Sequence, residues 1–301
     1  MLSLHTNAAA LSAQNSISRT QMALSTSQTR LSTGFRVNSA MDDAAGLQIA
    51  TRLTAQTSGM AMAMRNTQNS ISMLQTAEGA FDEVTTMLTR MKDLATQAAD
   101  ASSTAKDQAA LQSEFDALGS ELNNVMKNTT FGGAKLMDGG TIASSMTFQI
   151  GATKAETMSI DLSTAMTALT GTALTNVSAR YAAGGSAVGT EISDGTDGTA
   201  SVSNAAGQTA ANSAIDTIST ALDQVGGIRS SLGAAANRLD HVYNNLSNIS
   251  TNTKAAKGRI MDTDFAAESS NMTSSQMLLQ AGTAMLKQSN STSSLVMSLL
   301  Q

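Results

Sequence analysis

The sequence predicts a mainly α protein: a coiled-coil bundle of long helices formed by the N- and C-terminal halves, with a small β-hairpin region and a short surface insertion. Three observations carry this prediction. The 301 residues contain no proline, whereas an average chain of this length has about fifteen, so nothing interrupts long helices. Large apolar residues recur at steps of three, four and seven, which is helical spacing. Only residues 146–162 alternate apolar and polar side chains as strands do.

The two ends of the chain carry about one large apolar residue in every seven positions, which is roughly half of a coiled-coil seam. Such a helix buries too little apolar surface to offset the entropy of ordering it, alone or as a pair. We therefore predict that both ends are disordered in the free protein and order when many copies pack together, as in a polymer. The predicted inter-subunit residues are Leu4, Leu11, Ile17, Leu24, Leu31, Phe265, Met272, Leu279, Leu286, Leu299 and Leu300.

A joint is predicted between the first two helices, at residues 34–43. Gly34 can take the left-handed backbone conformation that ends a helix. Ser39 and Asp42 have the spacing of a capping box, in which the Ser39 hydroxyl accepts from the amide of Asp42 and the Asp42 carboxylate accepts from the amide of Ser39. Asp42 and Asp43 also suit the positive end of a new helix. One stretch thus ends one helix and begins another.

Arg36 lies inside this joint and is expected to pair with Asp42 or Asp43, or with another subunit. At an exposed site such a pair contributes about 0 to 1 kcal/mol. A second joint, at Gly258 and residues 262–264, mirrors the first.

The inner part of the chain has broader apolar faces. Residues 60–98, 111–125 and 215–249 step by three and four, so each predicts an amphipathic helix. Thr104 and Asp107 form a second capping box in front of the middle helix.

Between these helices the pattern changes twice. Residues 146–150 and 158–162 predict a hairpin with one covered face that lies on the helices. Residues 171–207 are rich in glycine, serine, threonine and alanine, and they predict a surface insertion with at most a short irregular excursion.

Composition and spacing argue against most other functions. The net charge is −5 and no basic block is present, which argues against nucleic acid. No apolar run of about 18 residues predicts a membrane span. The histidines, His5 and His241, stand in no metal-ligand spacing, and no nucleophile elbow or phosphate loop occurs. Asp42 and Asp43 diverge by about 100 degrees on a helix, so they cannot share a proton. We predict no catalytic, cofactor-binding or metal-binding residues.

Two features bear on the compartment. The first twenty residues lack a basic region followed by an apolar core, so they predict no cleavable signal peptide. The chain has no cysteine, so it is indifferent to redox state and could cross compartments without mispairing.

Two blocks of sequence resemble one family. The N-terminal block is RLSTGFRVNSA at residues 30–40 with DDAAG at residues 42–46. The C-terminal block includes RI at 259–260, DFA at 264–266, QAG at 280–282 and SLL at 298–300. Because both blocks occur in order, the chain resembles bacterial flagellin, in a short form with a small variable region. The joint residues that carry this resemblance are Gly34, Arg36, Asn38, Ser39, Asp42 and Asp43.

The resemblance implies an architecture. Residues 1–40 and 258–301 would form the inner core of a filament. Residues 41–170 and 208–257 would form a helical rod with the hairpin, and 171–207 a variable surface insertion.

It also implies a function. The chain would be a structural subunit, not an enzyme, that polymerises into the flagellar filament for motility. It would be exported by the flagellar type III apparatus and be extracellular. Its partners would be copies of itself, an export chaperone, and the cap and hook-associated proteins.

One segment resembles the part of flagellin that a Toll-like receptor reads. In LTRMKDLA, at residues 88–95, Arg90 and Leu94 match the contact positions of the family, and Glu114 matches a third position. Asp93 stands where glutamate is usual. The resemblance implies host recognition through Arg90, Leu94 and Glu114, whereas the residues alone fit equally well an Arg90 that is simply solvated.

Three alternatives stay open. A hook–filament junction protein of the same family would share the terminal helices but occur in few copies. A flagellin carrying an inserted protease would need a metal motif, and residues 171–207 contain no histidine. A secreted coiled-coil binding protein would have formed end helices as a monomer.

Overall fold

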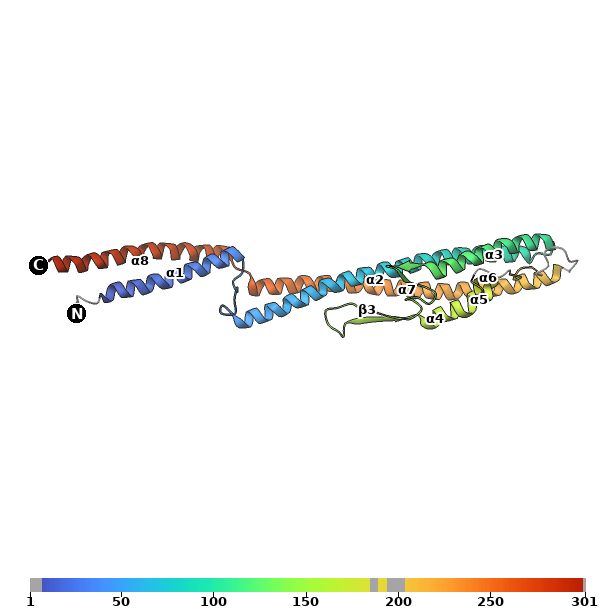
Figure 1. Cartoon of the computed structure of the whole chain (residues 1–301), viewed down its shortest axis with the longest axis horizontal. Coiled ribbons are helices and arrows are strands. Elements are labelled where there is room, and N and C mark those ends of the chain that lie inside the picture. Colours follow the sequence, from blue (N-terminus) through green and yellow to red (C-terminus); the bar gives the residue numbers. More distant parts are fainter. Residues whose placement is uncertain (1–6, 185–188, 194–203, 300–301) are drawn as a thin grey trace. The chain divides into compact units, whose positions relative to one another are not determined.

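The computed structural model describes residues 7–184, 189–193 and 204–299, and it describes side chains in these ranges except those of residues 204 and 292–299. The chain divides into two compact units: unit 1, residues 1–58 and 249–301, and unit 2, residues 59–248. The elements in chain order (Figure 1) are α1 (Ala8–Thr33), α2 (Ala44–Ala98), α3 (Ala105–Asn128), β1 (Thr130–Phe131), β2 (Ala134–Lys135), β3 (Ser145–Gln149), β4 (Thr157–Asp161), α4 (Ser163–Ala168), the π-helical turn η1 (Leu169–Ala173), α5 (Leu174–Val177), α6 (Ala179–Ala182), α7 (Asn204–Met261) and α8 (Phe265–Leu299).

Unit 2 is built on two long antiparallel helices, α2 and α7. Arg229 of α7 pairs with Glu78 at 3.3 Å and with Asp82 at 3.0 Å on α2. Further along both helices, Met60 of α2 and Leu246 of α7 belong to one small apolar cluster. Because the residue number rises on one helix as it falls on the other, the two helices run in opposite directions.

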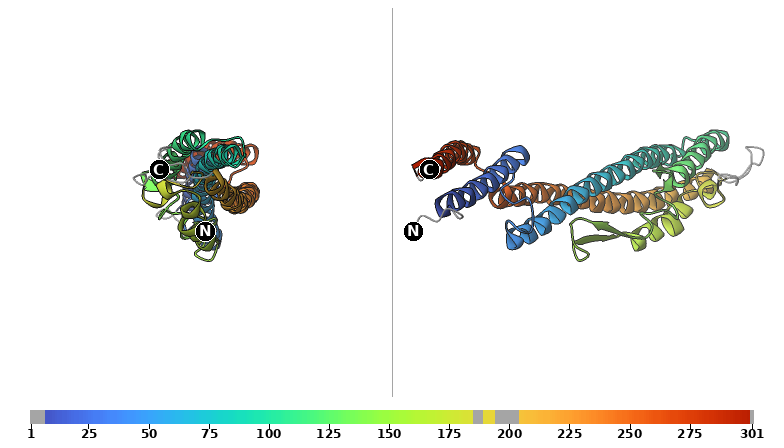
Figure 2. Two further views of the ribbon diagram at one scale, coloured as in Figure 1. Left: turned by 90° about the vertical axis from the view of Figure 1, so that its right-hand side faces the viewer. Right: turned by 60° about the vertical axis from the view of Figure 1, so that its left-hand side comes forward.

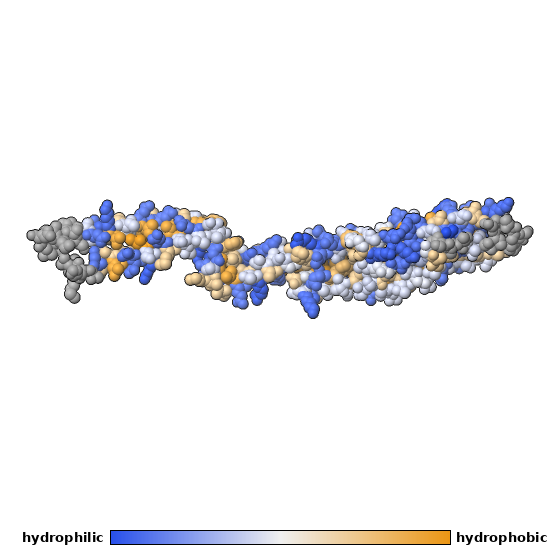
Figure 3. Space-filling model, viewed as in Figure 1, coloured by the Kyte–Doolittle hydropathy of each residue, from blue (hydrophilic) through white to orange (hydrophobic). Residues whose placement is uncertain are grey.

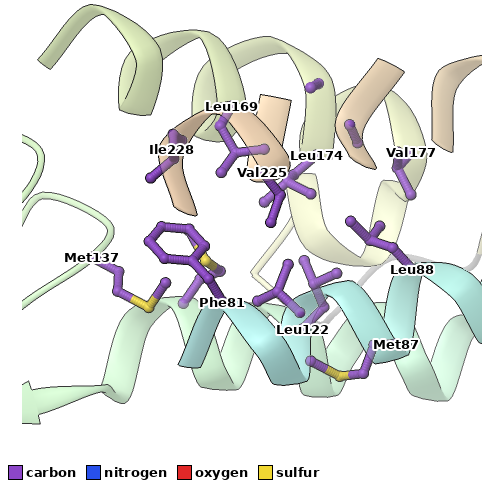
Figure 4. Close-up of a cluster of buried hydrophobic side chains, with 14 of the residues drawn as sticks. Phe81, Met87, Leu88, Leu122, Met137, Leu169, Leu174, Val177, Val225 and Ile228 are labelled. Atoms are coloured by element: carbon purple, nitrogen blue, oxygen red, sulfur yellow. The ribbon is translucent and has the colours of Figure 1, made fainter. Parts of the chain in front are cut away.

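The core of unit 2 lies between α2, α3, α7 and the short helices α4 to α6. Phe81, from the predicted apolar face of α2, and Phe115, from that of α3, are both 0% exposed. Figure 4 shows side chains of one buried cluster that come from different parts of the chain: Phe81 and Leu88 of α2, Leu122 of α3, Met137 after β2, Leu169 of η1, Leu174 and Val177 of α5, and Val225 and Ile228 of α7. A fully buried side chain of this size contributes about 1.5–3 kcal/mol, so unit 2 has a substantial core of its own.

The predicted capping box at the start of α3 is confirmed. The Thr104 hydroxyl accepts from the amide of Asp107 at 3.3 Å, and the Asp107 carboxylate accepts from the amide of Thr104 at 3.0 Å. These bonds hold the pKa of Asp107 below its usual value, chiefly through the Thr104 hydroxyl. At its other end α3 stops at Asn128, before the glycines at 132 and 133.

The predicted hairpin is also confirmed. β3 and β4 pair antiparallel, with Met146 opposite Ile160 and Phe148 opposite Met158. Met146 and Met158 are both 4% exposed, so one face is covered as the alternation predicts. The short pair β1–β2, in register from Thr130–Lys135 to Phe131–Ala134, was not predicted.

The prediction of a surface insertion from residue 171 is wrong for its first part. Leu174, Val177 and Tyr181 lie on α5 and α6 and are at most 5% exposed. Steps of three and four separate Leu174, Val177 and Tyr181, which is helical spacing, and the five-residue step before Leu174 spans the π-helical turn η1. Burial, with a smaller contribution from Asp138, raises the pKa of Tyr181 well above its usual value.

Residues 189–193 are likewise attached to the core, by polar contacts with α3. The amide of Ile192 donates to the Gln112 side chain at 2.8 Å. The amide of Gly189 donates to Asp116 at 3.2 Å, and Arg180 pairs with the same carboxylate at 3.3 Å. Ile192 is 0% exposed, so the chain returns to the core on this side of residues 194–203, which lie outside the described part.

Candidate assembly surface and joint

Unit 1 is organised around the antiparallel pair of α1 and α8. The two helices lie side by side in Figure 1 and in the right-hand view of Figure 2. Three contacts along the pair set its direction. Asn7 donates to Ser289, to its backbone oxygen at 3.3 Å and its hydroxyl at 3.1 Å. A Cβ on Gly282 would lie 2.9 Å from Cγ1 of Ile17. Arg30 pairs with Glu268 at 3.7 Å. The residue numbers of the partners run in opposite directions along the pair.

The seam of this pair uses most of the predicted apolar residues. Ile17, Leu24 and Leu31 differ by seven positions and therefore share one face of α1. On α8 the same holds for Met272, Leu279 and Leu286. All six are half-buried, so the structure places them in a contact within one chain, not on the outer face.

Leu11 lies outside this seam. The step from Leu11 to Ile17 is six positions, not seven, which turns Leu11 about 120 degrees around the helix from the seam. It is 55% exposed and shares its face with Met22, eleven positions on, which is 61% exposed. The outer face of α1 therefore carries large apolar side chains that the seam does not cover.

α8 has an outer face of the same kind. Leu278 and Met285 each precede a seam residue by one position and so project about 100 degrees from it, while Met277 lies about 160 degrees away from Leu279. Their exposed fractions are 60%, 67% and 60%. Figure 3 shows hydrophobic surface gathered over the α1–α8 pair. We call Leu11, Met22, Met277, Leu278 and Met285 the outer apolar face.

Four of these five residues were missed by the sequence analysis, because it counted only one residue per heptad. The signal was present: Met277-Leu278 and Met285 flank seam positions, and Met22 repeats Leu11 after three turns. Phe265 is 57% exposed. Its ring lies near Gly34, because a Cβ built on Gly34 would be 3.8 Å from the ring of Phe265. Leu4 and Leu300, and the side chain of Leu299, lie outside the described residues.

The predicted joint contains a left-handed glycine, as expected. Gly34 has φ of 74° and its amide donates to the oxygen of Arg30 at 2.8 Å, which ends α1. The two joints are bonded to each other through their backbones: Arg36 donates to the oxygen of Met261 at 2.6 Å, and Thr263 donates to the oxygen of Gly34 at 3.0 Å. A bridge between Phe35 and Asp262 lies between these bonds. These backbone bonds thus form a clamp that joins the C-terminal end of α1 to the N-terminal end of α8.

Arg36 takes a partner that the sequence did not suggest. Its guanidinium donates to the backbone oxygen of Ile260 at 3.1 Å, across the clamp, rather than to Asp42 or Asp43. Gly258 also differs from its prediction, since it lies inside α7, which continues to Met261. The second joint is therefore only residues 262–264.

The capping box predicted at Ser39 is only half correct. The Asp42 carboxylate accepts from the amides of Ser39 at 2.9 Å and Asn38 at 3.1 Å. The Ser39 hydroxyl, however, accepts from Met41 and not from Asp42. α2 begins at Ala44, and Asp43 caps it by accepting from Gly46 at 2.8 Å. The residues form a turn followed by a cap, because the amide of Asp42 donates to the backbone oxygen of Ser39 at 3.1 Å and not to its hydroxyl.

Asn38 completes this loop by donating to the oxygen of Phe35 at 2.8 Å. The Ser39 amide, followed by the Asn38 amide, lowers the pKa of Asp42 below 3.8, and the hydroxyl of Ser39 and the charge of Arg30 act in the same direction. The loop is therefore held together by an ionised carboxylate.

The three residues that resemble receptor contacts do not share one surface. Arg90 and Glu114 are exposed and pair with each other, through bonds of 2.8 and 2.6 Å between α2 and α3. Leu94 is 2% exposed and packs in the core of unit 2. As a contact residue it offers almost no surface in this structure, although the four positions from Arg90 turn it by only about 40 degrees around α2.

The described residues show no constellation for chemistry. No group of three or more metal-binding side chains comes together in them, and none of their helices is long and apolar enough to cross a membrane. His241 is exposed on α7.

The fold and this surface define a class: a long-helix structural protein with an uncovered apolar face, the class to which filament subunits belong. Sequence comparison supplies the family. The profile of the bacterial flagellin N-terminal helical region matches residues 4–141, and that of the C-terminal helical region matches residues 215–300. Flagellin A of Vibrio anguillarum is 35% identical over 379 aligned positions that cover all of both chains. Flagellin A of Vibrio cholerae serotype O1 is 34% identical over 387 positions, again covering both completely.

The chain belongs to the bacterial flagellin family. It is an extracellular structural component of the flagellar filament, which serves motility, and it is not an enzyme. Flagellins form filaments from copies of themselves, so its partner is the same chain. The aligned lengths exceed 301 residues, so the relatives contain segments that this short chain lacks. A solved structure described as a flagellar hook-associated protein from Vibrio parahaemolyticus shares the fold, with a TM-score of 0.57 and 17% identity over 73% of this chain and all of that one.

Proposed function

We propose that the chain assembles into the filament through the outer apolar face of α1 and α8, and that unit 1 forms the inner core. One observation carries the proposal: large apolar side chains stay more than half exposed on a helix pair that has almost no buried core. Among the described residues of unit 1, Val37 and Ala50 are the buried hydrophobic residues. Burying one large side chain contributes about 1.5–3 kcal/mol, so covering the outer face in every subunit would order both helices.

The remaining parts take their places from this proposal. Unit 2, which holds most of the predicted rod of residues 41–170 and 208–257, has its own core. The predicted variable insertion loses its first part, since Leu174, Val177 and Tyr181 are buried, and Ile192 is buried as well.

Seeded polymerisation tests the assembly surface. We expect Leu278→Gln to raise the subunit concentration needed for growth on filament seeds by about tenfold or more, because each 1.4 kcal/mol is a factor of ten. Met62→Gln is the matched control, since Met62 is 50% exposed on unit 2. Equal growth of both variants and the parent would contradict the proposal.

The same assay separates the filament subunit from a hook–filament junction protein. A filament subunit elongates seeds without limit as long as monomer remains. A junction protein adds a short layer and stops. The shared fold of the hook-associated structure fits both, so filament length measured by electron microscopy decides.

Export by the flagellar type III apparatus, with a chaperone in the cell and the cap and hook-associated proteins at the filament, completes the proposal. The chain has no proline and no cysteine. It can therefore unfold for passage without reduction of disulfides, and refold without slow proline isomerisation. We expect a strain without the export apparatus to retain the chain inside the cell. Normal secretion by that strain would exclude this route.

Recognition by the flagellin-sensing Toll-like receptor is proposed for Arg90 and Glu114, the exposed members of the predicted set. Their pairing across α2 and α3 presents an exposed pair of charged side chains. Arg90→Ala monomers should lose signalling in receptor-expressing cells, whereas Arg65→Ala, an exposed arginine on the same helix, should retain it. Unchanged signalling by Arg90→Ala would remove this part of the proposal.

A further inference from the structure

The methionines of this chain divide by unit. The sequence has 19 methionines and no cysteine, so thioethers are its only sulfur groups. Where side chains are described, five are at least half exposed, and four of these five lie in unit 1: Met22, Met41, Met277 and Met285, with Met62 in unit 2. The buried ones, at most 9% exposed, all lie in unit 2: Met60, Met87, Met91, Met126, Met137, Met146, Met158 and Met166.

We propose that Met22, Met277 and Met285 are oxidation sites of the free subunit, and that a hydroperoxide acting there blocks assembly. The inference rests on the proposed assembly surface, because these three residues make up most of the outer apolar face. Met22 is 61%, Met277 60% and Met285 67% exposed. A reagent in solution reaches them before assembly and loses access once copies cover the face.

The reaction needs only the thioether and the peroxide. A lone pair of the methionine sulfur attacks one peroxide oxygen, an S–O bond forms and the O–O bond breaks. The leaving hydroxide takes up the proton of the transferred oxygen and departs as water. Sulfur loses two electrons and the peroxide gains them, which gives methionine sulfoxide and one water for each hydrogen peroxide.

The product opposes burial. A sulfoxide oxygen is a strong hydrogen-bond acceptor, and an apolar contact leaves it without a donor when water is removed. Oxidation turns a flexible apolar side chain into a polar one, which disrupts methionine-rich interfaces. With three such sites in each subunit, we expect the concentration needed for growth on seeds to rise by at least tenfold.

Leucine supplies a matched variant, because it keeps an apolar side chain of similar volume and a high helix propensity but has no sulfur. The triple variant Met22→Leu/Met277→Leu/Met285→Leu removes the proposed sites. Met62→Leu, which removes an exposed methionine from unit 2, is the control. Met41, which is 97% exposed, stays in every variant and reports by peptide mass spectrometry that the peroxide acted.

The experiment treats each monomer with hydrogen peroxide, removes the peroxide and measures growth on untreated seeds. The parent and Met62→Leu should lose growth, and the triple variant should keep it although Met41 is oxidised. Treatment of the oxidised parent with methionine sulfoxide reductases should restore growth. Normal growth of the oxidised parent, or equal loss in the triple variant, would overturn the inference.

A second measurement tests the inference without the triple variant, in case that variant does not assemble even before treatment. Filaments of the parent, treated after assembly, should show Met22, Met277 and Met285 oxidised at least tenfold more slowly than in the monomer, while Met62 changes less. Equal oxidation in monomer and filament would contradict both the inference and the proposed surface. Protection in the filament together with full growth of the oxidised monomer would remove the inference alone.

Discussion

Unit 1 and unit 2 are both made of long helices, but only unit 2 has a core. In unit 2 the helices α2, α3 and α7 each turn a broad apolar face inward, and side chains such as Phe81, Phe115 and Leu122 are at most 1% exposed. In the described part of unit 1 the buried residues are few and mostly small or polar: Ser27, Val37, Ala50, Ser250 and Glu268, with Gly46. Long helices are thus stabilised by a core of large apolar side chains in unit 2, whereas the described part of unit 1 lacks such a core.

The difference comes from the spacing of apolar residues. Steps of three and four place a large side chain on one face at every turn, and packing then offsets the entropy of ordering the helix. A step of seven gives a seam of single residues, as with Ile17, Leu24 and Leu31 on α1. The other large residues, such as Met22, remain outside. A unit of this second kind is incomplete until other copies cover it.

The largest expected effect is on amide hydrogen exchange in a dilute, unpolymerised sample. We expect α1 and α8 to exchange about a thousandfold or more faster than the parts of α2 and α7 in unit 2, because amides of a packed core exchange only through opening that costs several kcal/mol. In filaments both sets should be slow. Slow exchange of α1 and α8 in the free monomer would refute the comparison of the two units.

The next largest effect is the loss of unfolding free energy when a cavity is created in unit 2. Phe81→Ala removes a ring that is 0% exposed and should lower the free energy of unfolding by about 3–5 kcal/mol. Phe265→Ala removes a ring that is 57% exposed and should change it by less than about 0.5 kcal/mol. Denaturant unfolding of both monomers measures the difference. A similar loss in the two variants would mean that unit 1 has core packing of its own.

A third change acts on the seam of unit 1. Gly282→Val places atoms within 3 Å of Ile17, since Cβ alone would lie 2.9 Å from Cγ1. Overpacking of this kind costs about 1–3 kcal/mol, and we expect it to appear as weaker seeded growth with unchanged thermal unfolding of unit 2. Gly79→Val is the control, because a Cβ there meets nothing within 4 Å. If Ile17→Ala does not restore growth to Gly282→Val, the close approach is not the cause.

Local signals were read correctly from the sequence where a few neighbouring residues decide the outcome. Gly34, the Thr104–Asp107 box and the alternation in β3 and β4 depend on bonds made within a few positions. The Ser39 hydroxyl failed as a cap because the amide of Asp42 donates to the backbone oxygen of Ser39 instead, and pattern alone does not say that Asp43 caps α2. Leu11 stays a predicted inter-subunit residue, because one six-residue step rotates it off the seam and onto the outer apolar face.

Burial was harder to predict, since it depends on distant partners. Leu174, Val177 and Tyr181 have helical spacing, but glycine, serine and threonine around them predicted a loop. Only the packing against α3 and α7 makes them core residues. Leu94 is the reverse case: the resemblance suggested an exposed contact, whereas the α2 face on which it lies turns inward.

A smaller effect is expected at two glycines of α7 in unit 2. Gly226 and Gly227 are exposed in the middle of the helix, and a Cβ at either would meet nothing within 4 Å. Each replacement by alanine should raise the free energy of unfolding by about 0.5–1 kcal/mol. Thermal unfolding of Gly226→Ala and Gly227→Ala monomers measures this. No gain would mean that these positions need a non-helical conformation at some stage.

The smallest effect is the acid sensitivity of the joint in unit 1. The folded pKa of Asp42 lies below 3.8, chiefly because the amides of Ser39 and Asn38 donate to its carboxylate. A lowered folded pKa means that this carboxylate stabilises the loop above about pH 3.9, its ordinary value, and loses that contribution as the pH falls through the folded pKa. Carbon NMR of the Asp42 carboxyl in filaments should show the low midpoint.

Asp42→Asn should remove this acid-dependent part, so that the amides of residues 38 and 39 no longer respond as the pH falls below about 3.9. Asp107→Asn is the control, because the pKa of Asp107 is lowered in the same direction by a capping box in unit 2, and its loss should leave the joint unchanged. If the joint amides titrate identically in the parent and in Asp42→Asn, another group holds the loop.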